Sequence, residues 1–174
     1  GVQYALQQAG ENRGELSKIL KYYQNQPEKL KAARFLIANM PAHRTYVGKE
    51  IDSLKQMKKE SIQKGRISDE IVAHWKTFNY SSSQVVEDID VIKADILIEN
   101  IDLAFEAWEK RSWSKQYSFE DFCEYVLPYR IGDEPLEKWR RIYYERYSPV
   151  LDSLYQGNDV VEAARVMANY LKEE

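Results

Sequence analysis

The sequence predicts an all-α fold, an irregular multi-helix domain of about seven to nine helices that spans residues 1–174 as a single domain. Residues that start and stop helices recur along the whole chain at the spacing of short helices. Only 7 Gly and 5 Pro occur in 174 residues, which disfavours sandwiches and barrels because those folds need frequent turns. No alternating apolar and polar run stands out as a strand.

The N-terminal third is expected to hold three helices. Asn12, followed three residues later by Glu15, has the pattern of a capping box and predicts the first helix start. Pro27 suits the first turn of a second helix, which the Met-Pro pair at Pro41 should end. A basic helix is predicted at about residues 47–64, and the glycine that follows it should terminate it.

The middle of the chain contains the clearest helix. Ser68 is expected to cap a helix over residues 69–78, and the pattern of residues 84–93 is ambiguous. Residues 94–110 have apolar side chains at the spacing of one helical face. These side chains are Leu97, Ile101, Ala104, Phe105 and Trp108. We therefore expect this helix to face the core.

The last third is divided by capping residues and prolines. Helix starts are predicted at Ser118, which forms a second capping-box pattern with Asp121, at Pro135 and at Asp159. Helix ends are predicted at Pro128 and near Pro149. These predicted starts and ends divide the last third into two shorter helices and a final amphipathic helix.

Charge and composition exclude several function classes. The net charge of −3 argues against nucleic-acid binding. Residues 1–66 are net basic and residues 67–174 net acidic, which indicates either that the two sets of helices pack together or that both faces are solvated. No apolar run approaches the roughly 18 residues of a membrane span, so we expect no transmembrane segment.

Patterns for catalysis and metal binding are weak. Cys123 is the single cysteine, and as a nucleophile it would need His43 or His74 beside it. A buried, unreactive cysteine is the better interpretation. The acidic run that begins at Asp88 has Lys93 where a calcium loop requires glycine, which favours a solvated acidic surface. We predict no catalytic residues, no metal and no cofactor in this chain.

The aromatic content is unusual, with 13 Tyr, 4 Trp and 5 Phe, and it is densest over residues 105–155. Tyrosine and tryptophan combine an apolar body with a polar group, so they serve a core, a protein interface or a ligand site. All three interpretations stay open. The interface or ligand candidates are Trp108, Trp113, Tyr117, Tyr129, Arg130, Trp139 and Arg140.

Arg130 follows a predicted helix end and is flanked by acidic residues. Its planar fork is suited to capping carbonyls or holding a carboxylate through two bonds. Arg130 is therefore either a brace inside the domain, paired with Asp133, Glu134 or Glu137, or a contact to another domain.

Four stretches go beyond general patterns. They are residues 9–16 (AGENRGEL), 32–41 (AARFLIANMP), 97–108 (LIENIDLAFEAW) and 119–140 (FEDFCEYVLPYRIGDEPLEKWR). Together they resemble the helical N-terminal region of bacterial transglutaminase-like proteins, over nearly the whole chain. The most specific of them is residues 119–140, which we call the signature segment. The resemblance implies that Cys123 belongs to a helical motif and is not a nucleophile.

The resemblance also implies a function and a location. In that family the helical region is followed by a papain-like transglutaminase domain that holds the Cys-His-Asp machinery, and no residue of this chain matches that machinery. We therefore expect a non-catalytic accessory domain that packs against or positions the catalytic fold. The expected location is the cell envelope, periplasmic or surface-exposed, with a lipid anchor in the full-length protein. The alternative is a carbohydrate- or peptide-binding module that uses the aromatic-rich surface.

Overall fold

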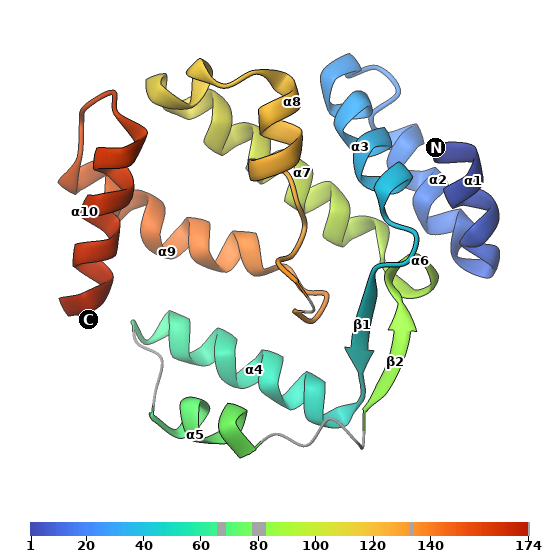
Figure 1. Ribbon diagram of the computed structural model, residues 1–174, viewed down its shortest axis with the longest axis horizontal. Helices are drawn as coiled ribbons and strands as arrows, with labels where there is room; N and C mark the ends of the chain where they lie inside the picture. Colours follow the sequence, from blue (N-terminus) through green and yellow to red (C-terminus); the bar gives the residue numbers. More distant parts are fainter. Residues whose placement is uncertain (66–68, 78–82, 133, 174) are drawn as a thin grey trace.

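The computed structural model describes residues 1–65, 69–77, 83–132 and 134–173, and these residues are mainly helical (Figure 1). The described ranges contain 10 helices, 8 of them with seven or more residues, so the all-α prediction is confirmed. They are α1 Val2–Gln8, α2 Arg13–Tyr22, α3 Pro27–Asn39, α4 Lys49–Gln63, α5 Asp69–Thr77, α6 Asp88–Val91, α7 Ala94–Lys110, α8 Phe119–Asp121, α9 Trp139–Leu154 and α10 Val160–Glu173. Short 3₁₀ segments, Gly10–Asn12 and Ser112–Gln116, and a π-helical turn, Phe122–Val126, complete the helical part.

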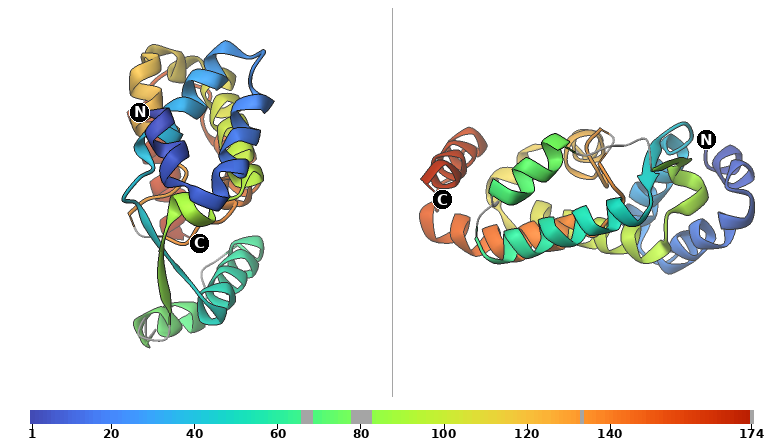
Figure 2. Two further views of the ribbon diagram at one scale, coloured as in Figure 1. Left: turned by 90° about the vertical axis from the view of Figure 1, so that its right-hand side faces the viewer. Right: turned by 90° about the horizontal axis from the view of Figure 1, so that it is seen from below.

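Helix α7 runs through the middle of the molecule and organises the rest (Figures 1 and 2). The N-terminal helices α1, α2 and α3 gather around one end of α7, while α9 and α10 lie toward the other end. Helices α4 and α5 form a separate layer that packs on α9 and is joined to the N-terminal end by two strands.

The core lies where α7 meets the N-terminal helices. The predicted apolar face of α7 is buried there, with Leu97, Ile101 and Phe105 among its members. Tyr23, which directly follows α2, is also fully buried, and its hydroxyl has two acceptors for its one proton, the carbonyl oxygen of Ile98 at 3.0 Å and the Asp102 carboxylate at 3.0 Å. A phenol in a core needs such a partner, because an unpaired buried hydroxyl is costly.

A small antiparallel sheet was not predicted from the sequence. Strand β1, Arg44–Val47, pairs with strand β2, Gln84–Glu87, which lies within the stretch that was ambiguous. Each strand has four residues, too few to show the period-2 pattern, although both are rich in β-branched side chains. Gly48 has φ +145° and makes the sharp turn from β1 into α4, a conformation that glycine favours.

The predicted capping box at Asn12 and Glu15 is wrong, although α2 begins where expected. Asn12 is buried, and its amide donates to the carbonyl oxygens of Ile89 at 3.0 Å and Ile92 at 2.9 Å, in and just after α6. The Glu15 carboxylate accepts from the backbone N–H of Ala94 at 2.8 Å, so it caps the start of α7. Both side chains therefore make tertiary contacts in place of the predicted capping box, and Glu15 also pairs with Lys18 of its own helix.

Other boundary predictions have mixed outcomes. The capping box of Ser118 and Asp121 is confirmed, as is Asp159 at the start of α10. Ser68 lies outside the described residues. The prediction of a helix start at Pro135 is wrong, since α9 begins at Trp139. The predicted end near Pro149 is also wrong, because α9 continues through that residue to Leu154.

The continuation of α9 through Pro149 has a physical explanation. Proline removes a backbone donor and crowds the preceding turn, which costs a helix about 3 kcal/mol. Arg111 donates to the Ser148 hydroxyl at 2.8 Å and to Asp152 at 2.9 Å, so it holds α9 on both sides of the proline. Lys110 adds a bond to Asp152 at 2.6 Å. These contacts offset the local cost.

The Asn12 contact gives a first test of the fold. Asn12→Ala should lower the free energy of unfolding by about 1–3 kcal/mol, because it leaves two buried carbonyl groups without a donor. Asn12→Asp should also destabilise, since a carboxylate cannot donate to those carbonyls. Asn39→Ala is the control, because the exposed Asn39 amide bonds only to its own helix, and it should change stability by less than about 0.5 kcal/mol. Equal urea midpoints for the three variants would contradict the assignment.

Candidate functional site

The seven candidate residues do not form one surface. Tyr129 and Arg130 are buried, while Trp108, Trp113, Trp139 and Arg140 are half-buried and Tyr117 is exposed. Tyr129, Arg130, Trp139 and Arg140 lie together in a polar network around the signature segment. The other three lie at the far end of α7 and in the 3₁₀ segment that follows it.

Arg130 is a brace inside the domain. Its Nε donates to Asp88 Oδ2 at 2.9 Å and its Nη2 lies 2.8 Å from the same oxygen. Nη2 also donates to the carbonyl oxygen of Arg44 at 2.6 Å, while Nη1 donates to those of Gly132 at 2.8 Å and Glu134 at 3.1 Å. A guanidinium carries five N–H donors, and these five contacts account for all of them.

The carboxylate that holds Arg130 was not among the predicted partners. The sequence suggested Asp133, Glu134 and Glu137, but the partner is Asp88 of α6, which has no exposed surface. Asp133 lies outside the described residues. Glu134 contributes only its backbone carbonyl to Arg130.

Tyr129 adds a third donor to the Asp88 carboxylate. Its hydroxyl lies 2.7 Å from Asp88 Oδ2. Burial, and then the Asp88 charge, raise the pKa of Tyr129 above its ordinary value, so the phenol stays a neutral donor. A buried carboxylate that contacts one guanidinium and one phenol is a structural ion pair, and both groups bind its Oδ2 atom.

Arg140 and Trp139 satisfy the carbonyl groups where the π-helical turn ends. Arg140 donates to the Val126 carbonyl at 2.6 Å and to the Asn100 side chain at 2.8 Å. The Asn100 amide donates in turn to the Leu127 carbonyl at 2.7 Å, and the Trp139 indole donates to the Tyr129 carbonyl. Burial lowers the pKa of Arg140 to about 10, which still leaves it charged at neutral pH. The signature segment is thus fixed by its own side chains.

Three candidates belong to the far end of α7. Trp108 stacks on Phe122 with ring centres 4.5 Å apart and makes an edge contact with Phe105 at 5.9 Å, so it closes the core. The Arg111 guanidinium lies 5.9 Å from the centre of the Trp113 ring. Tyr117 is the only one of the seven that is largely accessible.

Cys123 is buried in the π-helical turn. Burial raises the pKa of its thiol to about 11, so the reactive thiolate is scarce at neutral pH. Cys123 and His43 line a common cavity of about 700 Å³, but no hydrogen bond joins them among the residues that the structure describes. This environment is that of a packing residue.

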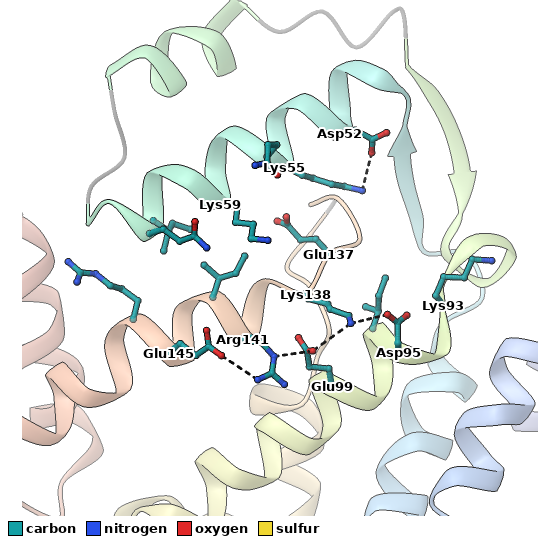
Figure 3. A pocket seen from close by; sticks show the side chains of 16 residues that line it. Asp52, Lys55, Lys59, Lys93, Asp95, Glu99, Glu137, Lys138, Arg141 and Glu145 are labelled. Atoms are coloured by element: carbon teal, nitrogen blue, oxygen red, sulfur yellow. Dashed lines mark hydrogen bonds and ion pairs between the residues drawn. The ribbon is translucent and has the colours of Figure 1, made fainter.

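A charged groove of about 840 Å³ lies between the helices (Figure 3). Helix α4 forms one wall, and the beginnings of α7 and α9 form the other. Most of its side chains are charged, and several are paired across the elements: Lys138 lies 2.9 Å from Asp95, and the Arg141 Nε lies 3.0 Å from Glu99. Sequence reasoning missed the groove because its walls come from three segments far apart in the chain.

The acidic run after residue 87 is therefore not simply a solvated surface. Asp88 is buried, while Asp95 and Glu99 pair with cations of α9 and the residue before it, and Asp102 pairs with Lys29 at 2.7 Å. In the described part of the chain no three Asp, Glu, His or Cys side chains gather in a way that could hold a metal ion.

Comparisons with known proteins give no family. No protein-family model matches the chain, and neither the curated proteins nor the solved structures contain a match. None of the described helices is long and apolar enough to cross a membrane. The function must therefore be argued from the geometry and from the resemblance of the four sequence stretches.

Removing the Arg130 side chain should strongly destabilise the chain. Arg130→Ala leaves the Asp88 carboxylate buried without a cation, which costs about 3–5 kcal/mol. Arg141→Ala is the matched control, because this half-exposed arginine of α9 makes surface ion pairs worth less than about 1 kcal/mol. Chemical denaturation measures both. Similar losses for the two variants would show that the buried pair has no special role.

The Cys123 thiol should be unreactive in the folded protein. With a thiol pKa of about 11 and a buried sulfur, a disulfide reagent at pH 8 should react many times more slowly than it does with the unfolded chain. The chain should also show no hydrolase or acyl-transfer activity. Activity that disappears in Cys123→Ala would contradict this assignment.

Proposed function

We propose that this chain is a non-catalytic helical accessory domain that precedes a transglutaminase-like domain in a secreted or cell-envelope protein and packs against or positions the catalytic fold. The proposal includes the periplasmic or surface-exposed location and the lipid anchor that the resemblance implies. One observation carries it: the four stretches that resemble that family contact one another in the structure.

The interlocking is specific. In the stretch 9–16, Glu15 caps α7, which contains the stretch 97–108. From α7, Asn100 bonds to the Leu127 carbonyl and to Arg140, both in the signature segment. Leu36, in the stretch 32–41, belongs to the same core. These four stretches are far apart in sequence but build one structural unit, and this supports the proposal.

The signature segment also supports a docking role. Although its backbone is fixed by internal bonds, it exposes two large apolar side chains, Tyr125 at 79% and Ile131 at 75%. Their neighbours Glu124 and Gly132 line the same cavity of about 700 Å³. A rigid segment that presents apolar side chains to solvent suits a domain interface, because little side-chain and loop ordering remains to oppose binding.

The alternative, a carbohydrate- or peptide-binding module, has less support. The residues that line the charged groove of about 840 Å³ include no aromatic side chain. Tyr129 and Trp139, two of the aromatic candidates, use their polar groups inside the domain. These polar groups are therefore not available to bond to a sugar.

The proposal is tested first by the coding sequence that follows residue 174, which should encode a transglutaminase-like domain. In that longer protein, Tyr125→Asp and Ile131→Asp should uncouple the domains, so that one thermal unfolding transition becomes two in calorimetry. The same changes should leave the melting temperature of the isolated chain within about 2 °C, because both side chains are exposed.

Tyr4→Asp is the matched control, since Tyr4 is 55% exposed on α1 and lies outside the signature segment. It should not alter the coupling. The absence of a transglutaminase-like domain would refute the proposal, whereas an unchanged single transition in both signature variants would refute only this docking face.

A further inference from the structure

The register of the small sheet shows which backbone groups point away from it. Arg44 pairs with Glu87 and Thr45 with Val86, and the backbone N–H of Asp88 donates to the His43 carbonyl at 2.9 Å. In an antiparallel ladder, hydrogen-bonded and non-hydrogen-bonded pairs alternate. Thr45 and Val86 therefore bond to each other, while Val85 and Glu87 direct their N–H and C=O groups to the outer side of β2.

By the same alternation, the carbonyl oxygen of Arg44 points to the outer side of β1, where the Arg130 side chain covers it. Arg130 donates to this carbonyl at 2.6 Å, which agrees with the assignment. β2 has no such cover: among the described residues, none bonds to the outward backbone groups of Val85 or Glu87. Figure 1 shows β2 on the side of β1 that faces away from α4.

A groove of about 460 Å³ is lined by residues of β2, together with Arg44 of β1 and two residues of α6. Its apolar lining comes from Val85, Val86 and Val91, and Val85 is 50% exposed. Its charged lining comes from Arg44, Glu87 and Asp90, of which Arg44 and Glu87 are cross-strand neighbours of opposite charge. The residues that line the groove therefore carry a net negative charge.

Free strand edges are commonly protected by lysine, proline or a bulge, because an open edge recruits other strands. The sequence of β2, Gln-Val-Val-Glu, has neither lysine nor proline, and its two valines favour the strand conformation. An open edge beside a partly apolar groove is the arrangement used for strand addition by a partner peptide.

We propose that the outer edge of β2 accepts an extended segment of a partner polypeptide as a third strand, with an apolar side chain in the valine-lined part of the groove and a basic side chain near Asp90. A second copy of this chain fits less well, since it would bring another Glu87 and Asp90 to a groove that is already acidic. The proposal goes beyond the accessory function and does not depend on which protein supplies the strand.

The test uses the 174-residue chain and the blocked peptide acetyl-Lys-Val-Thr-Val-Lys-amide, followed by NMR. The amide signals of Val85 and Glu87 should shift on titration and their hydrogen exchange should slow. Val85→Pro removes an outward N–H that the sheet does not use and should weaken binding about tenfold. Val85→Lys, which places a cation on the edge without changing the backbone, should weaken it as well.

Three controls define the outcome. Val161→Lys changes an exposed valine of α10 and should leave binding unchanged. The peptide with glutamate in place of both lysines should bind more weakly, and equal binding would overturn the charge part of the proposal. If the amide signals of Val85 and Glu87 do not shift on titration, the proposal that β2 accepts a third strand is wrong. If these signals instead shift with protein concentration in the absence of peptide, a second copy of this chain is the occupant, and the proposal of a partner segment is wrong.

Discussion

The buried ion pair between Asp88 and Arg130 is the contact on which the arrangement of this chain depends. It joins α6, the start of β1 and the loop before α9, segments that are more than 40 residues apart in sequence. Removing two charges from water is costly, and the cost is offset here because every donor of the guanidinium has an acceptor. The pair also fixes the layer of α4 and α5, since that layer is reached through the two strands.

The same need to satisfy buried polar groups accounts for part of the unusual aromatic content. Tyr23 and Tyr129 contribute apolar surface and also donate a hydrogen bond to a group far away in sequence, while the Trp139 indole donates to the carbonyl of Tyr129, ten residues earlier. Arg140 serves the same purpose at the carbonyls of the π-helical turn. In an irregular helical fold, many helix ends and loops must be buried, and long side chains with a polar tip are a means of satisfying their backbone groups.

The sequence predicted elements whose signals are local. The bounds of α7 follow from its apolar face, and the capping box of Ser118 follows from two residues three positions apart. Asn12 shows where this fails, because the side chain that could cap its own helix is taken by carbonyls in and after α6. Arg130 fails in the same way: acidic neighbours were available, but its partner is Asp88, 42 residues earlier. Long-range polar contacts leave no periodic pattern in a sequence.

The two surfaces proposed for interaction are linked through Arg130. Its Nη2 covers the outer carbonyl of β1, so the open edge of the sheet lies on β2. Its Nη1 bonds to the carbonyls of Gly132 and Glu134 and so fixes the loop from which Ile131 projects into solvent. One buried side chain thus contacts both the outer side of β1 and the loop that carries Ile131. A residue that contacts no partner can in this way support both surfaces, and its loss should disturb them together.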